Sequence, residues 1–355
     1  MLSDDFFHIT KKIYQDDPYY TPEDEGKIRW LLSPENPAWQ TSEIFMECEP
    51  GKGRLVGFHQ PDRVIDGKIS AFFGFWETMN DPHYVKQVFQ KFEAWAKGKG
   101  AQRIYGPIDF STHNRYRLRF PDTTIKAPFT GEPYNPGYYL DLLQDQGYQV
   151  SEHYRTRVFK YRKLARLYNR FKIARKPLPK HLEIITLDTQ TWHDKSDEIY
   201  HLIHNIFSKN FAYTKVSKEH FDQFITPAAT RIMSPRASVL IWDKAQSKCA
   251  GMAIVMPNYA SLTRQGAQSP INERELSYAE HMPLLHKPEV LGKTFGVMPE
   301  YRRLGLHNHL LFETGRRTKD YGKIVGFLAK TDNYSIRNIA VPSDVVSYGL
   351  FAKDL

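Results

Sequence analysis

The segment KTFGVMPEYRRLGLH, residues 293–307, carries the strongest indication of the fold in this sequence. An apolar strand is expected to end at Val297, because Pro299 lacks the N–H group that would continue the strand's hydrogen bonding. An amphipathic helix is expected over residues 304–321. A short basic loop therefore joins the end of a strand to the start of a helix.

This loop has the properties of an anion-binding site. The first turn of a helix has N–H groups without intrahelical partners, and it is the positive end of the helix dipole. Gly305 lets a phosphate approach the backbone closely, and Arg302 and Arg303 add positive charge and forked hydrogen-bond donors. The pattern predicts a site that can hold a pyrophosphate.

The same segment resembles the acyl-CoA-binding loop of the GCN5-related N-acetyltransferase (GNAT) family. That family has the pattern Arg/Gln-x-x-Gly-x-Gly/Ala after a strand that ends Val-x-Pro-x-x-Arg. Val297, Pro299, Arg302 and Gly305 match the pattern, whereas His307 stands where the family has Gly or Ala. The resemblance implies an acyl-CoA co-substrate, either acetyl-CoA or a longer acyl-CoA, and no metal.

The resemblance also implies which residues bind this co-substrate. Asn333 is included because an asparagine after the next strand commonly opens a helix near the CoA arm in the family. The implied cofactor-binding residues are Phe295, Val297, Met298, Arg302, Arg303, Leu304, Gly305, Leu306, His307 and Asn333.

Over nearly its whole length the chain is similar to the YghO-like group of bacterial GNAT-like proteins. The matching stretches are residues 17–20, 35–37, 73–77, 106–107, 134–139 and 296–302. The resemblance implies an α/β fold of the α+β layered type, made of tandem GNAT-like folds with mixed central sheets. It implies an N-terminal GNAT-like domain over 1–161, which we expect to be degenerate, a basic amphipathic connector over 162–181 and a C-terminal GNAT domain with the cofactor loop over 182–355.

Bulk composition agrees with a two-domain globular protein. The chain has 355 residues, more than one hydrophobic core usually spans, and its apolar content is 41%. It contains only two cysteines and no long uninterrupted apolar run, so we expect a cytoplasmic protein without a membrane span. The net charge of +9 indicates an affinity for polyanions without identifying which.

The connector is strongly basic. Residues 155–180 contain no acidic residue, and apolar residues within them have helical spacing. This segment is a basic amphipathic helix that either packs on one domain with a solvated face or docks an acidic carrier protein or anionic lipid. Nucleic acid is a third alternative, but no nucleic-acid-binding motif is present, so we do not expect that partner.

Local patterns predict alternating strands and helices in both halves. Residues 69–76 are expected to form a strand and residues 83–97 a helix with one apolar face. In the second half a helix is expected over 192–207 and a final strand over 345–353. Residues 77–82 stand in the first half where a phosphate loop would be, and their acidic side chains would repel pyrophosphate.

GNAT chemistry needs an amine made neutral by a base, a polarised thioester and an acid for the departing thiolate. Tyr348, on the final strand, and Tyr334 are candidate acids, and Asp332 is a candidate for orienting or deprotonating the amine. Each also has an ordinary interpretation: a tyrosine on a strand is often a core residue, and an aspartate before a helix is often its cap.

Asn210 and Tyr213 are candidate substrate-binding residues, because the corresponding region lines the acceptor pocket in GNAT folds. Nearby, His201 and His204 share a helix face and are expected to be solvated. The sequence therefore predicts an acyltransferase that moves an acyl group from acyl-CoA, or from an acyl carrier protein, to an amine of a small molecule. The alternative is a GNAT-fold binding or scaffold protein of a biosynthetic pathway without transferase activity. The acceptor and the acyl chain length stay open.

Overall fold

The computed structural model describes residues 2–160, 176–319, 321–331 and 342–355. Its contacts divide the chain into two compact units that interleave along the sequence. Unit 1 comprises Met1–Tyr154, Thr263–Asn272 and Val346–Leu355, and unit 2 comprises Arg155–Leu262 and Glu273–Val345. The connector predicted over 162–181 lies mostly outside the described residues.

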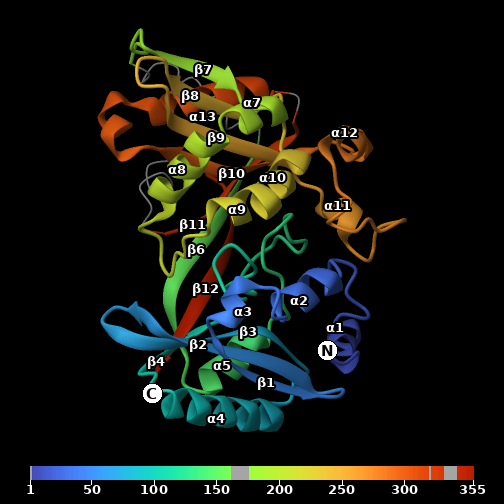
Figure 1. The fold of residues 1–355 in the computed structure, drawn as a ribbon. Helices are drawn as coiled ribbons and strands as arrows, with labels where there is room; N and C mark the ends of the chain where they lie inside the picture. The colour runs from blue at the N-terminus through green and yellow to red at the C-terminus, as the bar shows by residue number, and fades with distance from the viewer. Residues whose placement is uncertain (1, 161–175, 320, 332–341) are drawn as a thin grey trace. The chain divides into compact units, whose positions relative to one another are not determined.

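Unit 1 is a mixed sheet with helices on both faces (Figure 1). Its strand order is β1-β2-β3-β4-β12-β6, and β5 pairs with β12. The pairs β1–β2 and β2–β3 are antiparallel, whereas β3 and β4 are parallel. The elements are α1 (Asp5–Ile13), α2 (Glu25–Leu31), α3 (Pro37–Gln40), β1 (Glu43–Glu49), β2 (Gly53–Ile65), β3 (Lys68–Thr78), α4 (Pro82–Gly98), β4 (Arg103–Gly106), β5 (Leu118–Arg119), α5 (Tyr139–Asp145), β6 (Gln149–Lys160) and β12 (Asp344–Asp354).

The two faces of this sheet bury different side chains, because successive residues of a strand point to opposite sides. Leu55 of β2 belongs to the core that α4 and α5 cover. The neighbouring Arg54 points the other way, where its guanidinium lies 4.3 Å from the ring of Phe6 in α1. Helices α1 and α4 therefore cover opposite faces of the same strands.

Unit 2 has the strand order β6-β11-β10-β9-β8-β7, to which β6 contributes its second half. Strands β10 and β11 are parallel, while β7–β8, β8–β9 and β9–β10 are antiparallel. The elements are β7 (Leu182–Thr186), α7 (Thr189–Asp194), α8 (Ser196–Phe207), α9 (Lys218–His220), the π-helical turn η1 (Phe221–Ile225), α10 (Thr226–Ile232), β8 (Val239–Asp243), β9 (Lys248–Pro257), α11 (Ala260–Thr263), α12 (Tyr278–His281), the 3₁₀ turn η2 (Met282–Leu284), β10 (Glu289–Val297), the 3₁₀ turn η3 (Pro299–Leu304), α13 (Leu306–Arg317) and β11 (Lys323–Lys330).

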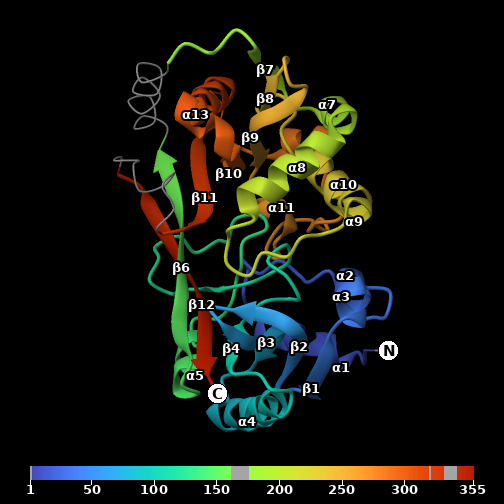
Figure 2. The ribbon, with the colours of Figure 1, turned by 60° about the vertical axis from the view of Figure 1, so that its left-hand side comes forward.

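Two cores flank the sheet of unit 2, and Figure 2 shows α13 on one side of the strands and α8 and α10 on the other. Val239 and Ile241 of β8 pack in the α13 core with Leu310. Leu240, between them, packs in the other core with Trp192 of α7. The alternation along β8 thus fixes which helices cover which face.

The helix predicted over 192–207 is two helices, α7 and α8, separated at Lys195. The carboxylate of Asp188 caps α7 by accepting from the N–H of Thr191. The apolar spacing continues across the break, because Trp192 of α7 and Leu202 of α8 enter the same core. The apolar pattern alone therefore could not reveal the break between the two helices.

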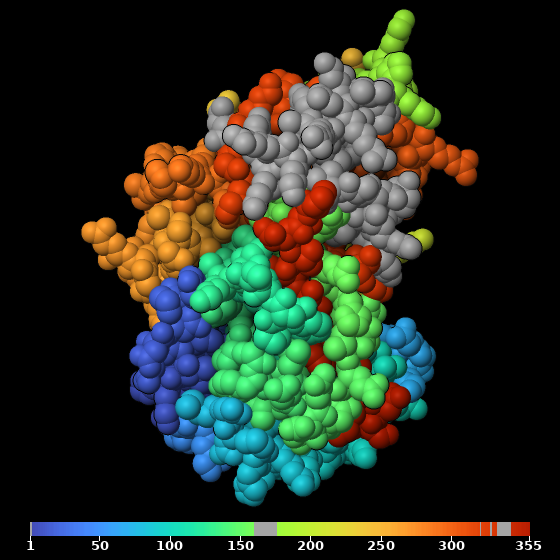
Figure 3. Space-filling view, turned by 180° about the vertical axis from the view of Figure 1, so that it is seen from behind, coloured from blue at the N-terminus to red at the C-terminus, as the bar shows by residue number. Residues whose placement is uncertain are grey.

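The last strand of the chain lies in unit 1, among residues far from it in sequence. Phe351 to Asp354 pair antiparallel with β4, and Tyr348 pairs with Arg119 of β5. Phe351 is fully buried in the core under α4 and α5. In Figure 3 the red C-terminal residues lie against the green residues of β6. Unit 1 therefore needs the C-terminus to complete its sheet.

Replacing Phe351 with alanine is expected to lower the free energy of unfolding by about 3–5 kcal/mol, the usual cost of removing a buried phenylalanine. Because the cavity opens in unit 1, amide hydrogen exchange should accelerate in α4 and β4 more than in β8 and β9. Val345→Ala, at an exposed position of the same strand, is the matched control. Faster exchange confined to unit 2 would contradict this placement of the last strand.

Candidate functional site

The predicted phosphate loop of unit 2 has a defined backbone path. Strand β10 ends at Val297, and the N–H of Met298 donates to the carbonyl of Ala250 on β9 at 3.0 Å. The chain then makes the turn η3 and reaches Gly305, whose φ of 73° lies in the left-handed region. Only glycine adopts this conformation without strain, so Gly305 is what allows α13 to begin directly after the turn.

Helix α13 starts without a side-chain cap. Its N-cap residue is Gly305, which has no side chain that could accept a hydrogen bond from the first turn. The N–H of Asn308 turns back to the carbonyl of Gly305, which leaves the N–H groups of Leu306 and His307 without helical partners. Arg302 beside them is exposed, and its Nε donates to the Val297 carbonyl at 3.3 Å. The arrangement suits an anion.

The corresponding helix of unit 1 begins differently. Helix α4 also follows a strand, β3, but its N-cap is Asp81, whose carboxylate accepts from the N–H of Tyr84 at 3.0 Å. The negative charge satisfies the helix end internally and repels a phosphate. Among the described residues, the start of α4 thus has a carboxylate cap and the start of α13 has none.

The loop of unit 2 is anchored to the turn between β8 and β9. Tyr301 donates a hydrogen bond of 2.6 Å to the buried carboxylate of Asp243, and Lys248 pairs with Glu300 at 3.2 Å. Burial acts to raise the pKa of Asp243, but the hydrogen bonds from Tyr301 and from the backbone N–H groups of Gln246 and Ala245 outweigh it and hold that pKa below its ordinary value. These contacts fix the position of η3, and with it the start of α13.

Several predicted cofactor-binding residues have structural roles in this unit. Leu306 is fully buried and Val297 nearly so, and both pack in the core between α13 and the sheet. Phe295, Met298 and Leu304 are half-buried against the same core. Their side chains hold the loop, so contact with a cofactor would run mainly through backbone atoms.

His307 and Arg303 differ from these core residues. Arg303 is exposed, and His307 is half-buried. Burial lowers the pKa of His307 below its ordinary value, so at neutral pH its imidazole is uncharged and adds no positive charge to the loop. The predicted residues Asp332, Asn333 and Tyr334 lie outside the described part of the chain.

The predicted substrate residues Asn210 and Tyr213 follow α8. The Tyr213 hydroxyl hydrogen-bonds to Nδ1 of His204, and burial raises the pKa of Tyr213 to about 12. The expectation that His204 is solvated is wrong, because its ring is buried against Tyr200. Asn210 is exposed.

Helix α8 packs on β10 at one point of close approach. A Cβ at Gly296 would lie 2.4 Å from the Cδ1 atom of Ile206, so only glycine fits there. Asn210 lies four residues beyond Ile206. The end of α8 therefore packs against the last residues of β10, the strand that leads into the loop.

The predicted acid Tyr348 belongs to unit 1, whereas the loop 297–307 belongs to unit 2. Its hydroxyl donates to the carboxylate of Glu132. Burial, followed by the charge of Glu132, raises the pKa of Tyr348 well above its ordinary value. The phenol is therefore protonated at physiological pH.

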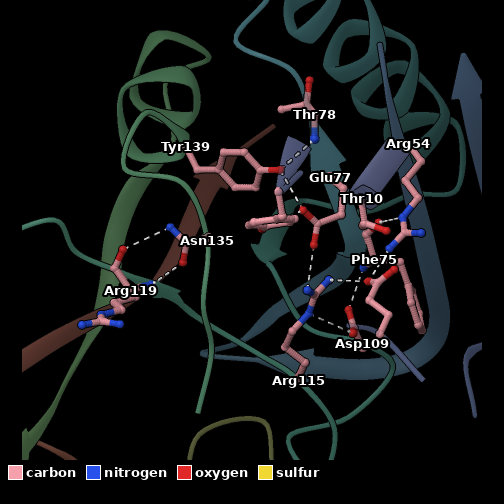
Figure 4. A network of polar contacts seen from close by, with 12 residues as sticks. Thr10, Arg54, Phe75, Glu77, Thr78, Asp109, Arg115, Arg119, Asn135 and Tyr139 are labelled. Carbon is pink, nitrogen blue, oxygen red and sulfur yellow. Dashed lines mark hydrogen bonds and ion pairs between the residues drawn. The ribbon is translucent and has the colours of Figure 1, made fainter. Parts of the chain in front are cut away.

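Unit 1 contains a network of buried charges that the sequence did not reveal as a group (Figure 4). At its centre, Glu77 of β3 accepts hydrogen bonds from Arg115 at 2.7 Å, from Tyr139 at 2.8 Å and from Tyr14 at 3.1 Å. Glu77 is 1% exposed. Burial raises the pKa of this carboxyl, against the opposing effect of Arg115.

Two further ion pairs complete this network, which we call the Glu77–Arg115 network. Asp109 lies 3.5 Å from Arg115 and accepts a 2.6 Å hydrogen bond from the N–H of Phe75. Arg54, fully buried, donates to the Phe75 carbonyl at 3.0 Å and pairs with Glu23 at 2.5 Å. The network ties β2, β3 and the segment after β4 together.

Two members of this network, Arg54 and Glu77, could have been suspected from the sequence. Arg54 and Glu77 flank the most apolar stretches of their strands, and a charge at such a position is rarely buried unless it is paired. The partners, Glu23, Asp109 and Arg115, lie in loops whose positions no local pattern predicts.

Within the described ranges, no three His, Cys, Asp or Glu side chains are grouped closely enough to hold a metal ion. None of the helices in those ranges combines the length and the apolar character that crossing a bilayer requires.

Comparison with known proteins identifies the fold. No protein-family model matches the chain. It is similar to a tandem GNAT protein from the clavulanic acid biosynthesis pathway, solved without AcCoA, at 11% identity and a TM-score of 0.53, covering 99% of this chain and 94% of that one. It is also similar to a probable N-acyltransferase from Enterococcus faecalis V583, at 11% identity and a TM-score of 0.50, covering 99% and 70% of the two chains.

A curated relative is more similar in sequence over a shorter stretch. Protein YghO of Escherichia coli K12 is 27% identical over 150 residues, which are 40% of this chain and 38% of YghO. The chain thus matches less than half the length of that relative. The predicted fold class is confirmed: the chain has the mixed α/β fold of tandem GNAT proteins, and the similarity to YghO is consistent with the predicted relation.

Replacing Tyr301 with phenylalanine should destabilise the loop by about 1–3 kcal/mol, because it removes a hydrogen bond from a buried carboxylate. The native pKa of Asp243 is lowered, so this contribution is present above its unfolded pKa and is lost as the pH falls through the folded value. The difference between the two proteins in urea unfolding should therefore be constant down to about pH 4 and shrink below it. Tyr278→Phe provides a control, and an unchanged difference in acid would contradict the proposed bond.

Replacing Arg115 with methionine should lower stability at pH 7 by about 2–4 kcal/mol, since two buried carboxylates lose their cation. The pKa values of Glu77 and Asp109 are raised by burial, so the folded protein binds protons more readily than the unfolded chain. The deficit should therefore decrease as the pH is lowered from 7 towards 5. Lys91→Met, which removes an exposed ion pair with Glu47, should cost less than about 1 kcal/mol throughout.

Proposed function

We propose that this protein is a GNAT-type N-acyltransferase that moves an acyl group from acyl-CoA, either acetyl-CoA or a longer acyl-CoA, to an amine of a small molecule. The observation that carries the proposal is the uncapped start of α13 after Gly305, next to the exposed Arg302. The probable N-acyltransferase and the tandem GNAT protein with the same fold support it by analogy. An acyl carrier protein bearing the same thioester is an alternative donor.

In the proposed reaction the lone pair of a neutral amine attacks the thioester carbonyl carbon. A C–N bond forms and the C–S bond breaks, the ammonium proton passes to a base, and the leaving thiolate takes up a proton. Asp332 is the proposed base, and Tyr334 or Tyr348 the proposed acid. The raised pKa of Tyr348 keeps its proton in place at neutral pH, which an acid requires.

The remaining residues of the proposed site bind and orient. Arg302 and Arg303, with the first N–H groups of α13, would hold the pyrophosphate. Asn333 would contact the CoA arm. Asn210 and Tyr213 would contact the acceptor amine, which the packing of α8 on β10 at Gly296 supports.

One observation supports the alternative of a binding protein without transferase activity. The helix that starts after β3 in unit 1 is capped by Asp81, whose negative charge disfavours an anion at that position. A chain that keeps the fold in one half without the phosphate loop shows that the fold alone does not require catalysis.

Isothermal titration with acetyl-CoA and with longer acyl-CoAs tests the proposal. Arg302→Ala should weaken binding by about tenfold or more, the effect of losing a hydrogen bond to a charged group. Arg316→Ala, on the same helix but ion-paired with Glu313, is the matched control and should bind as the native protein does. Release of free thiol with a panel of amines then measures turnover. Binding without thiol release would favour the alternative, and the absence of binding by any acyl-CoA would contradict the proposed site.

A further inference from the structure

Unit 1 contains a small cavity beside the Glu77–Arg115 network. Its lining includes Trp76 and Glu77 of β3, Asp109 and Arg117 of the segment after β4, and Asn135 and Tyr139 from the segment leading into α5. The cavity offers about 20 Å³ to water, which is room for one water molecule. Asn135 is only half-buried, so the cavity lies near the surface of the unit.

The acidic groups that line this cavity already have partners. Both oxygens of Glu77 accept hydrogen bonds, one from Arg115 and the other from Tyr139 and Tyr14. Asp109 accepts from the Phe75 N–H and lies beside Arg115. A cationic ligand would therefore find no free carboxylate here.

The donors of the cavity are not all used. Arg117 is 8% exposed, and its Nε donates to the carbonyl of Tyr116. In the part of the chain that the structure describes, no protein acceptor bonds to its two terminal nitrogens and no carboxylate lies within 4 Å of them, but neither nitrogen is sealed from solvent. The indole Nε1 of Trp76, which is 3% exposed, likewise has no hydrogen-bond partner among those residues.

Arg117 is held in place by its surroundings. Its guanidinium carbon lies 3.5 Å from the ring centre of Tyr116 and 4.3 Å from that of Tyr154. Its backbone has a φ of 79°, a conformation that a residue with a side chain adopts only when its surroundings impose it. The two tyrosine rings fix the orientation of the planar guanidinium and cover its faces. They do not provide acceptors for the N–H groups along its edge.

Trp76 supplies a buried N–H without an acceptor, and Arg117, which lines the same cavity, has edge donors that no protein group uses, so an acceptor of matching geometry can bind there. A carboxylate has that geometry, because its two oxygens meet the parallel N–H bonds of a guanidinium. The cavity has room for one water-sized group, so an oxygen of a carboxylate can enter it whereas a whole tetrahedral phosphate cannot.

We propose that this cavity of unit 1 is a binding site for the carboxylate group of a small ligand, with Arg117 as its forked donor and Trp76 as a neighbouring donor. The ligand class is a small carboxylic acid or amino acid whose remaining atoms extend towards Asn135. The site is independent of acyl-CoA binding in unit 2, so either proposal can fail without the other.

The test uses NMR spectra of protein labelled with ¹⁵N at its tryptophan indoles. The chain has six tryptophans, and the signal that disappears in Trp76→Phe is that of Trp76. Titration with sodium acetate or glycine should shift that signal in a saturable manner. Sodium chloride at equal ionic strength and methylammonium chloride should not. Arg117→Gln should weaken the response by about tenfold or more.

Arg103→Gln is the matched control, because Arg103 also lies over a tyrosine ring in unit 1, 5.2 Å from that of Tyr105, but outside the cavity. It should retain the native response. Trp76→Phe, followed through the methyl signal of acetate by saturation transfer, should bind more weakly than the native protein and serves if Arg117→Gln fails to fold. No shift with either carboxylate, an equal shift in Arg117→Gln, or a shift with methylammonium instead would overturn the proposal.

Discussion

The first turn of a helix must find acceptors for its free N–H groups, and the two halves of this chain meet that requirement differently. In unit 1 the carboxylate of Asp81 satisfies the start of α4. In unit 2 Gly305 occupies the equivalent place and has no side chain that could act as a cap. The same strand–turn–helix arrangement is therefore closed in one half and open to an anion in the other.

A helix start without a cap binds an anion well only if its backbone has a fixed position. The bond from Tyr301 to Asp243, the Lys248–Glu300 pair and the burial of Leu306 all fix the short segment between β10 and α13. None of these side chains needs to touch a ligand. Their contribution is to keep the backbone donors aimed in one direction, which lowers the entropy lost on binding.

The sequence predicted those features that depend on local pattern. Apolar periodicity located β3 and α4 to within a few residues, and Pro299 with Gly305 located the turn before α13. Local sequence patterns could not predict that the strand over 345–353 completes the sheet of unit 1. Its pairing partner is more than 200 residues away, and such pairing gives no local sequence pattern. The Glu77–Arg115 network was missed for the same reason: Glu23, Glu77 and Arg115 come together only in the folded chain.

The two units also differ in the exposure and the partners of their arginine side chains. In unit 1 Arg54 is fully buried and Arg115 is half-buried, and both are paired with carboxylates, as a charge removed from water requires. In unit 2 the arginines of the loop are exposed, where a bound anion can reach them. Arg117 differs from Arg54 and Arg115, since among the described residues no carboxylate pairs with it. Its edge donors and the unpaired N–H of Trp76 line one cavity, and we attribute both to a ligand that supplies the missing oxygens.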